Sequence, residues 1–130
     1  MTLPKVIFSI LGAAFIFGAA GTASAGDAEA GKTVFRKCTM CHSPEEGINK
    51  IGPSLFGVVG RTPGGIEGFR YSKAMSAFGE DGKVWTEGLI NEYLLAPRTL
   101  IPGNRMGFPG LRDETQRDDV IAYLKTLSNE

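Results

Sequence analysis

Apolar residues recur at helical spacing in several separate segments of the chain, and long stretches rich in glycine and proline lie between them. The clearest segment holds Leu89, Ile90, Tyr93 and Leu94 at positions i, i+1, i+4 and i+5, which line one face of an α-helix. Thr86 is a favourable N-cap residue for this segment, and Pro97 ends it. The pattern predicts a helix of about ten residues.

A second helical pattern lies near the C-terminal end. Its apolar stripe consists of Val120, Ile121, Leu124 and Leu127. Asp113 and Gln116 precede the stripe with the spacing of a capping box, in which aspartate replaces the usual serine or threonine. These residues predict a terminal helix that begins after Asp113.

A third helix is predicted at the start of the polar part of the chain. Asp27 is a suitable N-cap, Glu29 falls in the first turn, and Val34 and Phe35 supply apolar positions. We expect this helix to run to about Lys37 and to lead directly into the segment with the two cysteines.

The segments between these helices show no sustained period of either kind. Residues 43–68 and 99–111 are rich in glycine and proline, residues 72–78 fit a short helix, and residues 80–83 fit a turn. The predicted class is therefore all-α with long loops. Such loops are uncommon in a small domain, and a bound cofactor around which they wrap would account for them.

The first 25 residues have the three-part form of a secretory signal peptide: Lys5, an apolar run over residues 6–20, and an A-x-A sequence at residues 23–25. At about 15 residues, the apolar run is shorter than the roughly 20 that a membrane-spanning helix needs. We expect cleavage before Gly26, export to the bacterial periplasm, and a mature domain of residues 26–130. Retention of the segment as a membrane tether is the alternative.

The net charge and the length of the chain exclude some classes of function and limit the number of domains. The chain has 130 residues with 14 basic and 14 acidic side chains; without Lys5, 13 basic residues stand against the 14 acidic ones and the formal charge is −1. This balance argues against nucleic acid as a partner. Residues 26–130 are enough for one small domain and not for two.

Residues 38–42, with the sequence Cys-Thr-Met-Cys-His, form the signature of c-type haem attachment. Residues i and i+3 share a helical face and residue i+4 lies beside them, so one helical turn presents Cys38, Cys41 and His42 to the same side of a flat ring. The thiols would form thioethers with the two vinyl groups of haem, and the imidazole would bind its iron. We expect one covalent haem c.

Three other interpretations of the motif are weaker. A closed zinc site needs four protein ligands, whereas the chain has two cysteines and one histidine. A redox-active dithiol is expected beside a βαβ unit, and no strand alternates with a helix here. Two buried cysteines without a chemical role are the third alternative.

The second iron ligand decides between electron transfer and small-molecule chemistry. The chain has no second histidine, so methionine, lysine, tyrosine, water or an open site are the candidates. Met40 lies between the cysteines and cannot reach the opposite face of the ring, and Met75 is by default an apolar filler. Met106 lies in a turn-rich loop with little core to fill and is the favoured ligand. His/Met ligation raises the reduction potential and closes the sixth position.

The sequence closely resembles the class I c-type cytochromes, in the branch of mitochondrial cytochrome c and bacterial cytochrome c2. Besides the haem motif, the landmarks of this resemblance are Gly31, Phe35, Gly52-Pro53-Ser54-Leu55, Gly60-Arg61, Gly68-Phe69-Arg70-Tyr71, Trp85, Tyr93-Leu94, Ile101-Pro102-Gly103, Met106, Phe108 and Ile121-Ala122-Tyr123-Leu124-Lys125. The resemblance implies the class I cytochrome c fold, with short helices and long loops around one covalent haem. The terminal helices of that fold cross at Gly31, Phe35, Val120 and Tyr123.

The resemblance also implies the roles of the residues nearest the iron. Cys38 and Cys41 would carry the thioether links, and His42 and Met106 would be the axial ligands. The carbonyl of Pro53 would accept the other ring N–H of His42, which orients the ligand.

Further residues are implied to contact the haem. Arg61, Tyr71 and Trp85 match residues that bind the inner propionate, a buried carboxylate that requires donors. Tyr93 matches a residue that is hydrogen-bonded to the methionine sulfur. A plain core role is the alternative for Trp85 and Tyr93.

Three more residues match positions that lie near the haem in the family. Phe108 follows the methionine ligand as it does in the family. Asn104 replaces a threonine near the propionate, and Met75 replaces an asparagine near buried water. Hydration around the haem is therefore expected to differ from that of mitochondrial members.

The implied function is one-electron transfer by a soluble monomer that is not an enzyme. Its partners would be membrane or periplasmic redox proteins, such as a cytochrome bc1-type complex, an oxidase, a reaction centre or a dehydrogenase, which dock transiently at the haem edge. Basic residues match positions that ring this edge: Arg36, Lys37, Lys50, Arg98 and Arg105. The alternatives are a haem peroxidase or gas sensor in which Met106 leaves the iron, and the electron-donor subunit of one dehydrogenase.

Overall fold

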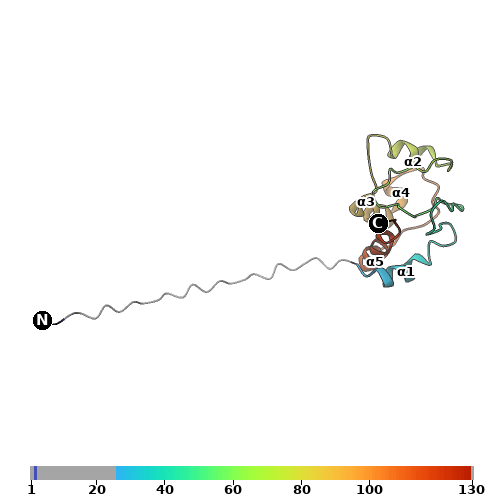
Figure 1. The fold of residues 1–130 in the computed structure, drawn as a ribbon. Coiled ribbons are helices and arrows are strands. Elements are labelled where there is room, and N and C mark those ends of the chain that lie inside the picture. Colours follow the sequence, from blue (N-terminus) through green and yellow to red (C-terminus); the bar gives the residue numbers. More distant parts are fainter. Residues whose placement is uncertain (1, 3–25, 130) are drawn as a thin grey trace.

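The computed structural model describes residue 2 and residues 26–129, so nearly all of the predicted signal peptide lies outside the described residues. Over residues 26–129 the chain forms five helices and no strand, which confirms the predicted all-α class (Figure 1). The helices are α1 (Ala28–Phe35), α2 (Lys73–Phe78), α3 (Glu87–Leu95), α4 (Pro97–Leu100) and α5 (Glu114–Lys125). Among the described residues, no helix has the length and apolar character to cross a bilayer.

Polar side chains start four of the helices. Asp27 accepts hydrogen bonds from the backbone N–H groups two and three residues later, at 2.8 and 3.1 Å. Ser72, Thr86 and Asp113 each accept one from the N–H three residues later, at 3.0, 3.1 and 3.1 Å. Each bond satisfies an N–H that has no partner inside its own helix. The predicted starts of α1, α3 and α5 are confirmed.

Two helix boundaries differ from the prediction. α1 ends at Phe35 instead of near Lys37, because the N–H groups of residues 36–38 bond to carbonyls three residues back, at 3.3, 3.1 and 2.8 Å, and wind the chain more tightly than an α-helix. Pro97 is predicted only to end α3, yet it also begins α4. Proline suits the first position of a helix because it has no N–H that would stay unpaired.

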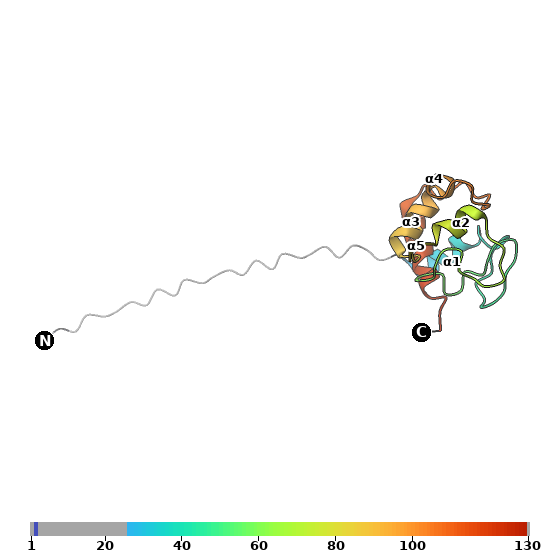
Figure 2. The ribbon, with the colours of Figure 1, turned by 90° about the horizontal axis from the view of Figure 1, so that it is seen from above.

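α1 and α5 cross in close contact, as two views at right angles show (Figures 1 and 2). Gly31 lies at the crossing, where a Cβ would be 1.9 Å from the carbonyl oxygen of Asp119, so only glycine permits this approach. Beside it, the rings of Phe35 and Tyr123 pack with their centroids 5.1 Å apart, and Val120 is buried. The implied crossing of the terminal helices is therefore confirmed.

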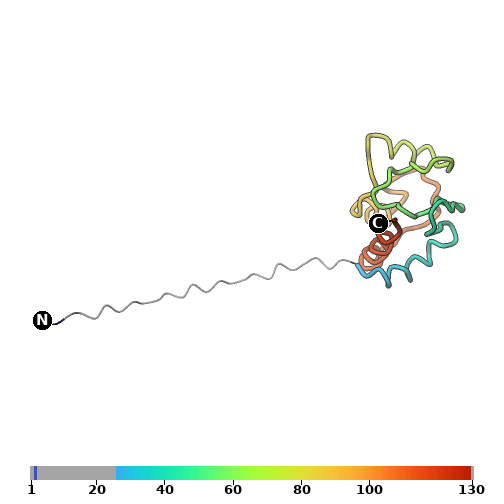
Figure 3. Tube along the Cα trace, in the orientation of Figure 1, coloured from blue at the N-terminus to red at the C-terminus, as the bar shows by residue number. Residues whose placement is uncertain are grey.

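The other helices differ in how they contact the crossing of α1 and α5. α3 packs against both α5 and α4, whereas α2 contacts no other helix within residues 26–129. Figure 3 follows the chain through the long loops that connect the helices. The buried hydrophobic residues are Phe35, Val58, Trp85, Ile90, Tyr93, Leu94, Ile101, Leu111, Val120, Ile121 and Leu124. α1, α3 and α5 thus provide a small packed frame, and the loops are left to surround a cofactor.

Replacing Gly31 with alanine is expected to destabilise the protein, although alanine is the better helix former. The added methyl group would overlap the α5 backbone, and we expect the free energy of unfolding to fall by about 2 kcal/mol, as in other overpacked sites. Denaturant-induced unfolding of the purified protein measures this loss.

The matched control is Gly88→Ala in α3, because a Cβ at Gly88 meets nothing within 4 Å. At this position alanine should raise the free energy of unfolding, by up to about 1 kcal/mol. The same change in stability at both glycines would contradict the close approach of α1 to α5.

Candidate functional site

The cysteine motif forms one tight turn shortly after α1. The carbonyl of Cys38 accepts hydrogen bonds from the N–H groups of Cys41, at 3.1 Å, and His42, at 2.8 Å. The second bond closes an α-type turn, so residues 38–42 form the single helical turn that their spacing predicts. Lys50 Nζ donates to the Thr39 carbonyl at 2.8 Å and ties the turn to the next loop.

Both thiols are free and half-buried. Burial and the nearby Cys41 raise the pKa of Cys38 to about 11, although Lys37 opposes the shift. A thiol with a raised pKa is unlike the reactive cysteine of a redox dithiol, whose pKa is lowered. Among the described residues, no three side chains of the Cys, His, Asp or Glu type are grouped to hold a metal ion.

The His42 ring is oriented by a hydrogen bond to the backbone. Its Nδ1 lies 2.7 Å from the carbonyl oxygen of Pro53, so Nδ1 carries the proton of the neutral ring and the lone pair of Nε2 is free to bind a metal. Burial lowers the pKa of His42, the Pro53 carbonyl opposes this, and Arg61 lowers the pKa further. The imidazole is thus kept in the neutral form that metal binding requires.

Gly52 also belongs to the site, although the sequence singles it out only as part of a landmark. A Cβ at Gly52 would lie 2.4 Å from His42 Cε1 and 2.8 Å from His42 Nδ1. Its N–H donates to the Cys41 carbonyl at 2.7 Å. The backbone before Pro53 therefore runs directly against the imidazole, and the Gly-Pro pair soon after the motif is the only signal of this in the sequence.

Arg61, Tyr71 and Trp85, which are implied to bind a propionate, gather in one region. The backbone N–H of Trp85 donates to the Arg61 carbonyl at 2.8 Å. Arg61 Nη1 donates to the carbonyls of Ser54, at 3.0 Å, and Phe56, at 3.1 Å. Burial lowers the pKa of Arg61, whereas the nearby Tyr71 raises it. The Tyr71 oxygen accepts the N–H of Ile66 at 3.3 Å, which leaves its own O–H free to donate.

Tyr93 belongs to an aromatic group that joins α2 and α3. Its ring centroid lies 5.1 Å from that of Trp85, which in turn lies 5.9 Å from Phe78. Burial raises the pKa of Tyr93 to about 12. Its hydroxyl therefore stays protonated and can donate a hydrogen bond.

Met106 lies in the loop between α4 and α5, where it and Phe108 are half-buried and pack against the hydrophobic core. The end of this loop is anchored on α3. The N–H of Leu111 donates to the Leu94 carbonyl at 2.7 Å, and a Cβ at Gly110 would be 2.3 Å from another carbonyl oxygen of α3.

Asn104 lies near the start of the same loop and bonds to backbone groups with both ends of its amide. Nδ2 donates to the carbonyls of Ile101, at 2.8 Å, and Pro97, at 3.0 Å. Oδ1 accepts the N–H of Met106 at 2.8 Å. A contact with a propionate, which the resemblance implies for this position, would need a donor, and both N–H groups of the amide have partners within the chain.

Arg117 in α5 is a buried cation that the sequence analysis missed. Its Nη1 donates to the carbonyls of Leu111, at 2.8 Å, and Arg112, at 2.9 Å, and its Nε donates to Asn91 Oδ1 at 2.9 Å. It thus ties the end of the Met106 loop to α5 and α3. An arginine within a charged helical segment resembles a solvated surface residue, so the sequence carries no signal for this role.

Together these residues fit a covalently attached haem. Two thiols and a neutral imidazole project from one turn, and a thioether is available on a separate anchored loop. Half-buried apolar side chains from several segments pack against the core and have surface left for a ring to cover: Leu55, Val59, Met75, Phe78, Met106 and Phe108. These are the ligand types and the surroundings that haem uses in proteins.

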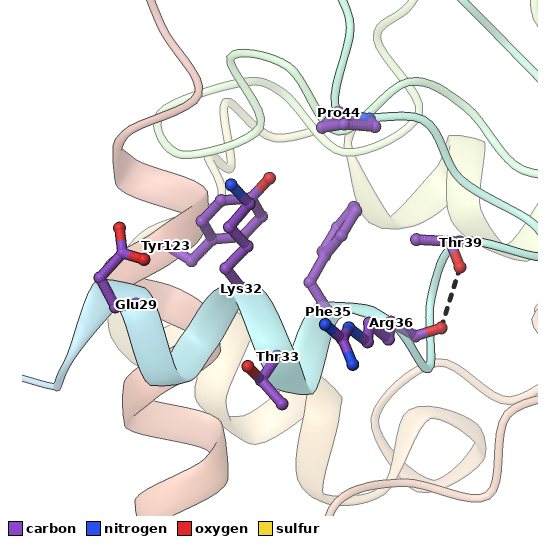
Figure 4. Close-up of a pocket in the computed structure, with 8 residues that line it drawn as sticks. All are labelled: Glu29, Lys32, Thr33, Phe35, Arg36, Thr39, Pro44 and Tyr123. Carbon is purple, nitrogen blue, oxygen red and sulfur yellow. Dashed lines mark hydrogen bonds between the residues drawn. The ribbon is translucent and has the colours of Figure 1, made fainter.

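A pocket of about 440 Å³ lies on the surface beside the attachment turn (Figure 4). It is lined by Glu29, Lys32, Thr33, Phe35, Arg36, Thr39, Pro44 and Tyr123. The hydroxyl of Thr39 donates to the Arg36 carbonyl at 2.9 Å at its edge. None of its lining residues is among those predicted to contact haem, although Thr39 lies between the two cysteines of the motif.

Comparisons with known proteins agree with this geometry. Residues 28–128 match the family model of cytochrome c. Cytochrome c2 of Afifella marina is 46% identical over 102 residues, which are 78% of this chain and 82% of the relative. Cytochrome c2 of Blastochloris viridis is 42% identical over 126 residues, which are 95% of this chain and 94% of the relative.

A solved structure shows the same fold. The structure of cytochrome c2 from Rhodospirillum centenum superposes with a TM-score of 0.75 at 37% sequence identity, over 79% of this chain and 99% of that one. The implied class I cytochrome c fold is confirmed. The chain therefore belongs to the cytochrome c family, whose members transfer electrons rather than catalyse reactions and carry one covalently bound haem c.

Proposed function

We propose that the protein is a one-electron carrier in which His42 and Met106 are the two axial ligands of the haem iron. The observation that carries this proposal is the 2.7 Å contact between His42 Nδ1 and the Pro53 carbonyl, which leaves Nε2 as the nitrogen available to the iron. Met106 is half-buried in a loop anchored at its end, whereas Met40 is 85% exposed between the two cysteines. When bound, haem supplies an iron that changes its oxidation state by one electron.

The surrounding side chains orient the ligands and neutralise charge. Pro53 holds the imidazole proton at Nδ1 and thereby fixes the ring. Tyr93, whose pKa is raised to about 12 by burial, keeps an O–H that can donate to the thioether sulfur. Arg61 and Tyr71 provide N–H and O–H donors for a propionate, which would be costly to bury without them.

Firmly held ligands on both sides suit electron transfer. A peroxidase or a gas sensor needs an open or labile sixth position, so that a small molecule can reach the iron. Here the Met106 loop is fastened to α3 through Leu111 and to α5 through Arg117. We infer that Met106 stays in place when an electron arrives or leaves.

We further propose that redox partners dock transiently at the haem edge. The five basic residues that match positions around this edge are all exposed: Arg36, Lys37, Lys50, Arg98 and Arg105. Met40, within the attachment turn, and Ile51, in the loop beside it, are 85% and 81% exposed. Apolar side chains bordered by positive charge favour brief encounters with acidic partners, such as a cytochrome bc1-type complex, an oxidase, a reaction centre or a dehydrogenase.

Export to the periplasm and removal of residues 1–25 are also part of the proposal. Gly26, the first residue of the expected mature domain, already packs against α5, where a Cβ would lie 2.1 Å from the Asp118 carbonyl oxygen. The N–H of Asp27 donates to Asp119 Oδ1 at 2.7 Å. The match with cytochrome c2 of Blastochloris viridis covers 95% of this chain and so includes part of the first 25 residues.

The variant Met106→Ala tests the proposed ligand set. It should lose the weak far-red absorption band that a methionine–Fe(III) bond gives, and its reduction potential should fall by on the order of 0.2 V, within the roughly 0.8 V range that axial ligands span. Absorption spectra and redox titration measure both. Met40→Ala removes an exposed methionine instead and should retain the band; a wild-type protein without the band would rule out Met106 as the ligand.

Carbon monoxide distinguishes the carrier from a peroxidase or gas sensor. When it is added to the reduced wild-type protein, we expect little change in the absorption spectrum, because Met106 occupies the position at which it would bind. Met106→Ala serves as the positive control and should respond rapidly and completely. A complete response of the wild-type protein would favour the alternative function.

Ionic strength tests the proposed docking surface. Electron transfer to an acidic cytochrome oxidase should slow as salt is added, because salt screens the attraction between exposed charges. At low salt, Arg98→Glu should slow the reaction by about threefold in stopped-flow measurements. Lys83→Glu is the control, because it makes the same change in charge at a residue that is not one of the five basic positions. Lys83 Nζ instead lies 3.9 Å from Asp81 Oδ2. Absence of any salt dependence would remove electrostatic steering from the proposal.

A further inference from the structure

The segment around Met106 has few packing contacts of its own. Gly103, Arg105, Gly107 and Pro109 are all exposed, and Met106 itself is only half-buried. Neither a helix nor a strand passes through this segment. Besides the packing of Met106 and Phe108 against the core, individual hydrogen bonds therefore hold its conformation, and the one at the Met106 N–H comes from Asn104.

The Asn104 amide fits its surroundings in one orientation only. Nδ2 faces two acceptors, the carbonyls of Ile101 and Pro97, at 2.8 and 3.0 Å. Oδ1 faces one donor, the N–H of Met106, at 2.8 Å. A flipped amide would place oxygen against two carbonyls and N–H groups against another N–H. These contacts thus use both N–H groups of the Asn104 side chain as donors and its carbonyl oxygen as an acceptor.

These three hydrogen bonds connect helix α4 with the backbone of Met106. Pro97 begins α4 and Ile101 caps its C-terminal end. The bond to Met106 spans two residues, which is a local turn that asparagine side chains favour. The amide therefore joins the end of α4 to the backbone of Met106 itself.

We propose that Asn104 is a positioning residue that holds the Met106 backbone in the conformation needed for iron ligation, and that this role replaces the propionate contact implied by the family resemblance. The inference rests on the proposed His42/Met106 ligation. Methionine has three rotatable side-chain bonds, so a fixed backbone is the means by which the chain can limit where its sulfur goes. A ligand held by its supporting contacts is harder to displace than one on a loose loop.

The test uses imidazole as a competing ligand for the ferric, haem-loaded protein. In Asn104→Ala, all three bonds are lost and the dissociation constant for imidazole should fall about tenfold, a difference of about 1.4 kcal/mol. Asn104→Ser keeps a side-chain oxygen that can accept the Met106 N–H, so its dissociation constant should lie between those of the wild type and Asn104→Ala. Spectrophotometric titration gives all three values.

A second readout follows the contact itself. In the reduced, haem-loaded protein, hydrogen exchange of the Met106 N–H measured by NMR should be faster in Asn104→Ala than in the wild type. The matched control is Asp27→Ala, which removes bonds of the same kind, from the N–H groups of Glu29 and Ala30 to Asp27 Oδ1 at 2.8 and 3.1 Å, at the start of α1. This control should leave both the Met106 exchange rate and the imidazole dissociation constant unchanged.

The outcomes separate this inference from the proposed function. If the wild type binds imidazole as tightly as Met106→Ala does, Met106 is not the ligand and the proposed function fails, whatever Asn104 does to the exchange rate. If the wild type resists imidazole but Asn104→Ala and the wild type behave alike in both measurements, the proposed function stands and the positioning role is overturned. Equal imidazole binding by Asn104→Ser and Asn104→Ala would also overturn it, because the bond to the Met106 N–H would then have no effect.

Discussion

Under the proposed ligation, the rest of the domain depends on one constraint: two thiols and an imidazole must reach a rigid, flat ring from a single turn of backbone. The turn from Cys38 to His42 achieves this with one α-type hydrogen bond. Gly52 and Pro53 then hold the imidazole, through direct contact and through the bond at Nδ1. Because covalent links fix the ring relative to this turn, every other residue of the site has to approach the ring, and the ring cannot adjust its position to them.

Helices and loops contribute differently to that approach. α1, α3 and α5 pack through buried apolar side chains and form the frame behind the turn. The loops lack a regular ladder of hydrogen bonds, and polar side chains fix them through bonds to the backbone, as Arg61, Asn104 and Arg117 do. Such bonds can hold one irregular conformation, and the loop residues Val58, Ile101 and Leu111 add apolar contacts within the core. The half-buried apolar side chains of the loops leave further surface for haem to cover.

An electron carrier and a haem enzyme can use the same haem group. They differ in how firmly the protein holds the sixth ligand of the iron. In this chain the loop of Met106 is fastened at both ends, by Asn104 to the end of α4 and by Arg117 to α5 and α3. Arg117 and Asn104 share no hydrogen-bond partner. In the role proposed for Asn104, contacts within the chain take the place of the polar contact with the cofactor that the resemblance implies at this position.

The sequence by itself determined the features that depend on residues a few positions apart. These are the starts of α1, α3 and α5 at Asp27, Thr86 and Asp113, the turn of the haem motif, and the class of cofactor, because a cap or a CxxCH motif acts within one helical turn. The end of α1 and the existence of α4 were not predicted, since they depend on tight turns that leave no apolar period. Only the tertiary structure decided that Gly52 lies against His42 and that Arg117 bonds to Asn91, 26 residues away. Such contacts follow from the path of irregular loops through space, and no local spacing of residue types encodes that path.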